Sequence, residues 1–158
     1  MKAANAAARA FRTILCPVDF SDASRVALQF AGAVAERFRG KLVVLFVNDP
    51  LLVAAAAAAY DERGLAATTM KELGRFVERA LKGRGGPSPS CRVALGNPAR
   101  EILKAAKRLR CDAIVMGTSG AGAAGRFFFG STTERVMRSA TLPVLAVPPV
   151  KRRPRASR

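Results

Sequence analysis

The feature that most constrains the fold is a run of six residues in which every position is apolar. Residues 42–47 read Leu-Val-Val-Leu-Phe-Val, whereas a strand with one face in water alternates apolar and polar residues. A strand that is apolar throughout is covered on both faces, which is typical of the centre of a parallel sheet. We therefore expect residues 42–47 to lie inside a sheet that has a layer packed on each side.

Four further segments have the length and composition of strands, and helical patterns separate them. The segment 90–95 is short and more polar, so we expect it near an edge of the sheet. Prolines flank the last segment, 142–148, which favours an edge strand or one that pairs across a subunit boundary. Strands that alternate with helices form a parallel sheet with helices on both faces. The remaining two segments are residues 13–18 and 112–116.

Apolar residues at helical spacing predict the helices between these strands. Ser21 is the expected N-cap of the first helix, and Gly40 is expected to end it. Asn97 is the expected N-cap of a later helix, with Pro98 at its first position. Residues 51–60 are rich in alanine and suit either a helix or a mobile connection. The expected buried stripe of the first helix consists of Val26, Phe30, Val34 and Phe38, with Ala27, Ala31 and Ala35 beside it. A second helix, over about 65–81, is expected to bury Leu73, Val77 and Leu81, flanked by Met70, Phe76 and Ala80. The helix that begins at Pro98 is expected to bury Ile102, Leu103, Ala106 and Leu109.

A glycine-rich loop between the strand at 112–116 and a following helix predicts phosphate binding. Two residues separate Gly117 from Gly120, and nine separate Gly120 from Gly130, which Ser131 follows. Glycines let the backbone approach an anion closely, and the free N–H groups and the dipole of a helix start attract negative charge. A flexible connection is the alternative interpretation of these glycines.

The helix after this loop opens with Ser131-Thr132-Thr133-Glu134, which matches the capping-box pattern. The Ser131 hydroxyl would therefore either cap its own helix or bind phosphate. The backbone N–H of the same residue is available to an anion in both cases.

Charge and composition narrow the chemistry that the chain can perform. The 158 residues carry a formal net charge of +16, which suits nucleotides, nucleic acid or acidic surfaces, although a general bias toward arginine explains it equally well. The sequence contains no histidine, which excludes Ser-His-Asp and Cys-His nucleophiles, histidine bases and histidine metal ligands. Cys16, Cys91 and Cys111 lack CxxC spacing, and we expect buried free thiols in a reducing compartment.

Two other nucleotide-binding motifs and a membrane span are missing from the sequence. The pattern G-x4-G-K-[ST] does not occur, so the chain is not a P-loop protein. The residues after the strand 13–18 are Asp19-Phe20-Ser21, which lack the glycines of the dinucleotide-binding fingerprint. No apolar span approaches the ~18 residues of a membrane helix.

Four stretches of the sequence together resemble the universal stress protein family. They are residues 14–21, 45–47, 96–102 and the glycine loop as it continues to Pro148. The most specific part is G-x2-G-x9-G-[ST], which looks like the signature of the ATP-binding branch. The resemblance implies an α/β fold in which helices sandwich a five-stranded parallel sheet, Rossmann-like and similar to the adenine nucleotide alpha hydrolases. It also implies a homodimer paired through the last strand, residues 143–147.

The resemblance further implies where individual residues lie around an ATP molecule. The adenine and ribose side would be lined by Pro17, Val18 and Asp19 together with the backbone of Val47. The floor beneath the ribose and phosphates would be formed by Met116, Gly117 and Gly120. The phosphate chain would be held through backbone N–H groups and hydroxyls by Gly130, Ser131, Thr132 and Thr133.

Three features near this site have alternative interpretations. Asp19 would contact the nucleotide or its Mg²⁺, or it is only a partner of the helix dipole. Arg126 would clamp phosphate, or it is a solvated loop charge. Phe127-Phe128-Phe129 is expected to pack in the core or in a dimer contact rather than to stack on adenine. No residue is expected to ligate a metal directly or to act as a catalytic group.

The sequence thus predicts a cytoplasmic ATP-binding universal stress protein that acts as a nucleotide-dependent switch in the stress response, without efficient turnover. A slow ATP hydrolase or phosphotransferase is one alternative, with Asp19 and Glu134 as the nearest acids. A basic adaptor for nucleic acid or anionic surfaces is the other, and its binding would be weak and salt-sensitive. The expected organisation is a frayed leader at 1–10, one domain at 11–149 and a basic tail at 150–158.

Overall fold

The chain forms a five-stranded parallel sheet, with the strand order β3-β2-β1-β4-β5. A computed structural model describes residues 11–56, 62–86, 88–119 and 129–149, apart from a few side chains within these ranges. β1 and β2 are paired along six residues, from Thr13 with Lys41 to Val18 with Phe46. The strands are β1 (Thr13–Val18), β2 (Lys41–Asn48), β3 (Ser90–Leu95), β4 (Ala113–Gly117) and β5 (Val144–Val147).

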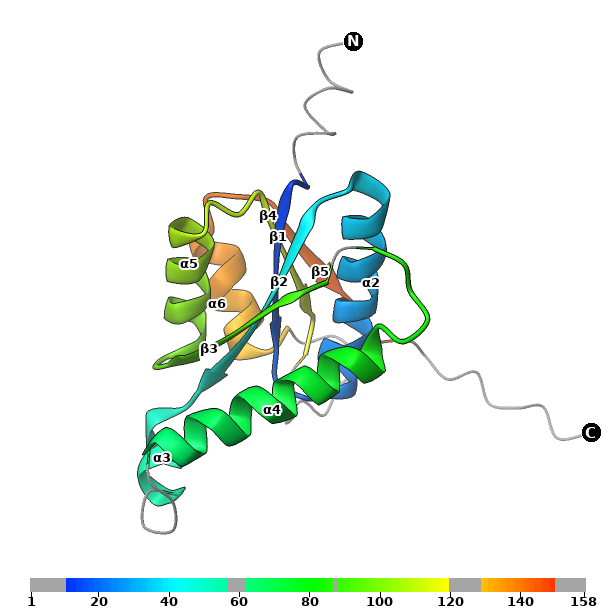
Figure 1. The fold of residues 1–158 in the computed structure, drawn as a ribbon. Coiled ribbons are helices and arrows are strands. Elements are labelled where there is room, and N and C mark those ends of the chain that lie inside the picture. The colour runs from blue at the N-terminus through cyan, green and yellow to red at the C-terminus, as the bar shows by residue number, and fades with distance from the viewer. Residues whose placement is uncertain (1–10, 57–61, 87, 120–128, 150–158) are drawn as a thin grey trace, which may run out of the picture.

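Helices cover both faces of this sheet (Figure 1). α2 and α4 pack on one face, and α5 and α6 pack on the other. The expected α/β architecture is therefore confirmed. Of the two readings of residues 51–60, the helical one holds over 51–56, while 57–60 lie outside the described residues. The helices are α2 (Asp22–Phe38), α3 (Pro50–Ala56), α4 (Glu62–Ala80), α5 (Pro98–Arg108) and α6 (Ser131–Ser139).

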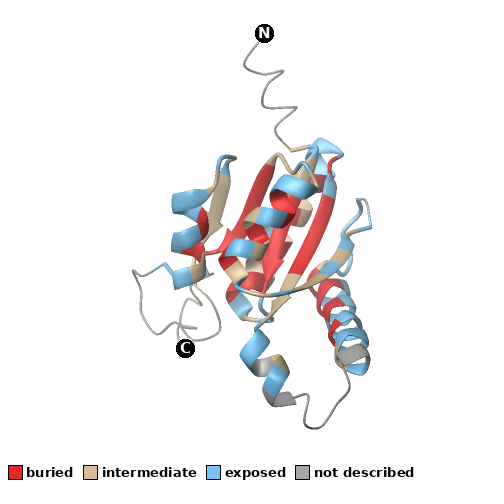
Figure 2. Cartoon of the chain, turned by 90° about the vertical axis from the view of Figure 1, so that its left-hand side faces the viewer, coloured by how far each residue is buried: buried red, intermediate tan, exposed pale blue. Residues whose placement is uncertain are grey.

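Alternate strand residues supply two separate cores, one in each layer. Ile14 and Val44 pack under α2 and α4, whereas Leu15 and Val43 pack under α5 and α6. Figure 2 shows these central strands as the most deeply buried part of the fold. The outer strands, β3 and β5, are only partly buried. The edge position expected for residues 90–95 is confirmed, and residues 142–148 also contain an edge strand.

The stripe that α2 buries differs from the one expected. Its alanines and Leu28 face the sheet, while Phe30 and Phe38 remain 44% and 38% exposed. The sector of the helix that faces the sheet is the one with Ala27, Leu28, Ala31 and Ala35, and the two rings lie outside this sector. The prediction that the phenylalanines form the buried centre of this helix is therefore wrong.

The other helices follow their expected stripes with smaller shifts. In α4, Leu73, Phe76, Val77 and Ala80 are buried, but Met70 is 40% exposed. In α5, Ile102 and Ala106 are buried as expected, whereas Leu103 and Leu109 are only partly buried. Ala99 and Ala105 take their place in the centre of the stripe.

Gly40 is needed for close packing rather than to end α2. The left-handed residue at the end of this helix is Arg39, with φ 52°, so the expected glycine cap is wrong. A Cβ atom on Gly40 would collide with the Phe11 carbonyl oxygen, because the chain entering β2 passes directly beside the chain entering β1. The Gly40 N–H donates to the Ala35 carbonyl at 2.8 Å.

We expect Gly40→Ala to destabilise the fold by about 3 kcal/mol, since backbone must move to admit the methyl group. Gly74→Ala is the matched control, because a Cβ atom at this α4 position meets nothing within 4 Å. The control should gain about 1 kcal/mol from helix propensity. Urea unfolding of both variants measures the two changes, and equal midpoints would contradict this account of Gly40.

Candidate functional site

A cavity lies where the order of the strands reverses. The chain proceeds outward from β1 to β2 and β3, and α5 then returns it to β4 on the other side of β1. In open parallel sheets, such a reversal leaves a crevice at the carboxyl ends of the two strands. The cavity occupies this position with a volume of about 490 Å³, which lies in the range of small-molecule sites.

Every described residue that the sequence assigned to the site lines this one cavity. Gly120 and Arg126 lie outside the described residues. Sequence reasoning missed five lining residues, of which Leu45 was detectable as the neighbour of Val47 on the same face of its strand. The expected residues in the lining are Pro17, Val18, Asp19, Val47, Met116, Gly117, Gly130, Ser131, Thr132 and Thr133, and the missed ones are Ser24, Leu45, Pro98, Ile102 and Ser119.

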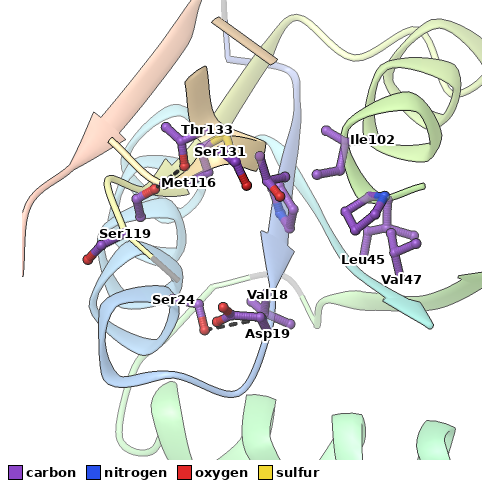
Figure 3. A pocket seen from close by; sticks show the side chains of 15 residues that line it. Val18, Asp19, Ser24, Leu45, Val47, Ile102, Met116, Ser119, Ser131 and Thr133 are labelled. Carbon is purple, nitrogen blue, oxygen red and sulfur yellow. Dashed lines mark hydrogen bonds between the residues drawn. The ribbon is translucent and has the colours of Figure 1, made fainter. Parts of the chain in front are cut away.

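The cavity has an apolar side and a hydroxyl side (Figure 3). Leu45, Val47 and Ile102 lie together on one side, and they come from β2 and α5. Ser119 and Ser131 lie on the other side, next to the start of α6. A ligand with a flat apolar part and a polar anionic part would therefore meet a suitable surface at each end.

The start of α6 leaves backbone donors at the hydroxyl side. Gly130 is the N-cap residue, and its lack of a side chain rules out the capping box expected at Ser131. α2 and α5 differ, because the side chains of Ser21 and Asn97 accept from their first turns at 3.1 and 3.2 Å. Within the described residues, nothing accepts from the N–H groups of the first turn, 131–133. These groups are free for an anion.

Thr133 positions this helix start rather than offering its hydroxyl proton to a ligand. The side chain is buried, and its Oγ1 donates to the Gly117 carbonyl at 2.9 Å. Gly117 in turn lies against α2, because a Cβ atom there would be 3.1 Å from the carbonyl group of Ala23. The end of β4 is thus held between the starts of two helices, which fixes one wall of the cavity.

Asp19 is the one charged side chain among the described lining residues. Its carboxylate accepts from the backbone N–H of Ser21 at 3.1 Å and from the hydroxyl of the same residue. Its own N–H donates to the Ser24 hydroxyl at 3.3 Å, which donates to the Ser21 carbonyl at 3.0 Å. The turn after β1 therefore holds a carboxylate at the rim of the cavity in a defined orientation.

Phe20 stabilises this turn, and sequence reasoning missed it. Its backbone has φ 63°, a left-handed conformation that costs a non-glycine residue about 1–2 kcal/mol. The ring compensates by stacking on Phe46 at 4.5 Å and meeting Phe76 edge-on at 5.4 Å. Aromatic packing at the end of β1 thus maintains a strained backbone next to the cavity.

Other reactive groups in the described residues lie away from this site. Glu134 forms an ion pair with Arg138 at 2.8 Å and does not line the cavity, so only one of the two acids named for hydrolysis is in place. Burial raises the pKa of the Cys16 thiol, and burial together with Asp112 raises that of Cys111 to about 11. Among the described residues, no cluster of three metal-ligating side chains occurs, and no helix is long and apolar enough to cross a membrane.

Comparison with known proteins places the chain among its relatives. A model of the universal stress protein family matches residues 10–148. A universal stress protein of Thermus aquaticus is 35% identical over 144 residues, covering 87% of this chain and 98% of that protein. The solved hypothetical protein MJ0577 has a TM-score of 0.73 at 26% identity, covering 90% of this chain and 99% of that one. UspA from Lactobacillus plantarum has a TM-score of 0.69 at 30% identity, covering 87% and 97%.

Two further relatives of known structure were solved with adenine nucleotides. A universal stress protein in complex with cAMP has a TM-score of 0.63 at 21% identity, covering 89% of this chain and 98% of that one. The Archaeoglobus fulgidus protein in complex with dAMP has a TM-score of 0.57 at 19% identity, covering 87% and 97%. At these identities the likeness concerns the fold. On the family model and the Thermus aquaticus relative together, this chain belongs to the universal stress protein family.

Proposed function

We propose that the protein binds ATP in this cavity and acts in the cytoplasm as a nucleotide-dependent switch in the stress response. The observation that carries the proposal is the pairing of an apolar wall with the uncapped start of α6 across one cavity. An adenine ring needs the first surface, and a phosphate chain needs the second. The relatives solved with cAMP and dAMP support an adenine nucleotide in this fold.

The proposed pose follows from the two sides of the cavity. The adenine ring lies against Val47 and Ile102, and the ribose lies over Val18 and Met116. The phosphates extend toward the backbone N–H groups at the start of α6. The complete spacing G-x2-G-x9-G-[ST] favours a triphosphate, since its loop supplies backbone to several phosphate groups.

Mg²⁺ would accompany the triphosphate in this proposal. Magnesium is usually held by one or two carboxylates together with phosphate oxygens, and Asp19 offers one carboxylate at the rim of the cavity. The ion would neutralise phosphate charge next to a lining in which no described lysine or arginine occurs. Arg126, outside the described residues, is a proposed second source of positive charge.

We expect Ser131→Asp to weaken ATP binding at least about tenfold, measured by isothermal titration calorimetry with Mg²⁺. A carboxylate there repels the phosphates, yet negative charge at a helix start stabilises the helix. The thermal midpoint should therefore stay unchanged or rise, which separates lost binding from lost folding. Ser131→Asn is the matched neutral control and should bind within a few-fold of wild type.

Two results would contradict the proposed site. Wild-type protein that binds no ATP at millimolar nucleotide would remove the proposed function. Equal affinities for the Asp and Asn variants would show that the nucleotide's phosphates do not lie near the start of α6.

A slow hydrolase is the second candidate, because Asp19 is an acid that lines the cavity. Its carboxylate accepts two hydrogen bonds from Ser21, which suits a fixed ion-binding group better than a base that must take a proton. We expect wild type and Asp19→Ala to release phosphate from ATP at the same background rate in a purified turnover assay. A clear excess for wild type would instead establish catalysis.

We also propose that two copies pair through β5. β4 occupies one side of this strand, no described strand pairs with its other side, and the residues of β5 are only partly buried. Ala146→Arg should shift the mass measured by light scattering from dimer to monomer. Leu95→Arg on the opposite edge strand is the control, because Leu95 is already 55% exposed. Pairing through β3 instead would reverse the two results.

A further inference from the structure

The end of the sheet opposite the cavity carries a concentration of unpaired positive charge. Seven exposed cations gather where β1, β2 and β4 begin, and we call this set the basic end. No ion pair among the described residues involves any of them. The set consists of Arg12, Arg37, Arg39, Lys41, Lys107, Arg108 and Arg110.

Backbone contacts bring these residues together from three separate parts of the sequence. The Lys41 N–H donates to the Arg12 carbonyl at 2.7 Å. The Asp112 N–H donates to the Thr13 carbonyl at 2.8 Å, which places the turn at Arg110 on the other side of the same strand. Because β1 is central, Arg12 lies between the cations that precede β2 and those that precede β4.

The fold itself explains why cations collect at this end. The helices run opposite to the parallel strands, so the carboxyl ends of α2 and α5 both lie where the strands begin (Figure 1). Cations at the last turn of a helix stabilise it against the dipole, and Arg37, Lys107 and Arg108 occupy such positions. The parallel architecture therefore turns a local preference of each helix into one basic surface.

Two of the arginines occur at positions where glycine is the usual residue. Arg39 follows α2 with φ 52°, and Arg110 follows α5 with φ 50°. Glycine or asparagine normally takes this left-handed conformation because other residues are strained there. The two arginines therefore add positive charge at positions where the backbone conformation alone would favour an uncharged residue.

Few acids offset the basic end. Glu36 and Asp112 are the carboxylates beside it, and Asp112 already accepts from the Thr13 N–H at 2.7 Å. Seven cations against two acids leave a net charge of +5 on this surface. By contrast, Asp22, Glu101 and Glu134 lie in the first turns of their helices, at the cavity end of the molecule.

We propose that the basic end binds the phosphate backbone of double-stranded nucleic acid. Five of the seven cations are arginines, whose planar guanidinium groups match phosphate oxygens in pairs. Binding of single strands relies on several aromatic rings on which successive bases stack, whereas the exposed ring that the structure describes beside these cations is Phe38, which packs on Phe11 at 5.0 Å. This surface belongs to the folded domain, so it differs from the basic segment 150–158 and from the nucleotide cavity.

The test measures binding of a short fluorescent DNA duplex to the full chain by anisotropy over a series of salt concentrations. The basic-end variant carries Arg12→Ala, Lys41→Ala and Arg108→Ala, and it leaves the left-handed arginines in place. Losing three phosphate contacts should weaken binding at least about tenfold and reduce the slope of log K against log salt by about 3. All three side chains are exposed, so the thermal midpoint should fall only by the small amount expected from losing one cation, Arg108, at the end of α5.

Two control variants separate this surface from charge in general. The first control removes the same charge from exposed positions elsewhere, through Lys71→Ala, Arg75→Ala and Arg92→Ala. Its affinity for the duplex should change only a few-fold. The second control removes three of the five positive charges in residues 150–158, through Lys151→Ala, Arg152→Ala and Arg153→Ala. The loss of duplex affinity should be larger for the basic-end variant than for this tail variant. Equal losses in all three variants, or a loss confined to the tail variant, would overturn the proposal.

A further measurement compares binding of the DNA duplex with binding to vesicles of anionic phospholipid. The proposal expects the duplex to be bound in preference to the vesicles, and the basic-end substitutions to affect the duplex. Wild-type protein that binds no duplex at low salt would overturn it, as would basic-end substitutions that release vesicles while leaving duplex binding unchanged. ATP titration of the same variant reports on the opposite end of the sheet, so failure of one proposal leaves the other intact.

Discussion

The parallel direction of the strands is the constraint on which the rest of this structure depends. It places all strand carboxyl ends, and the starts of the helices that follow them, at one end of the molecule. The reversal of strand order between β1 and β4 then opens a cavity at that end, with backbone donors on its rim. The same geometry sends helix carboxyl ends, and the cations that stabilise them, to the far end. One topology therefore produces both surfaces to which we assign binding.

The cavity keeps its shape through contacts that bind no ligand. Thr133 fastens the start of α6 to the Gly117 carbonyl, and Gly117 allows β4 to approach α2. On the other wall, the stacked ring of Phe20 maintains a left-handed turn that presents Asp19 at the rim. These contacts hold the start of α6 and the turn after β1 in place, so that the proposed phosphate would meet donors that are already oriented.

The sequence predicted which described residues line the cavity better than it predicted the local contacts around them. Apolar runs and the glycine spacing identified strand ends, and strand ends are where parallel sheets place their cavities. Ile102 was missed because an apolar residue that lines a cavity looks the same in sequence as one in the core, whereas Leu45 was detectable as the neighbour of Val47 on the same face of its strand. The capping box at Ser131 was wrong because the pattern fits one residue further along than the observed cap, Gly130. The Phe30 stripe was wrong because two neighbouring sectors of α2 are apolar, and periodicity does not show which of them faces the sheet.

By itself, the sequence determined the order and type of the strands and helices, because apolar periodicity and capping residues act over a few neighbouring positions. It also contains the glycine spacing from which phosphate binding is predicted, and that spacing is local. Only the tertiary structure decided which distant residues meet, such as Thr133 with Gly117 or Arg12 with Lys41. It also decided that cations scattered along the chain share one end of the molecule. Such contacts depend on strand order and helix direction, and these arise only when the whole sheet buries both of its faces.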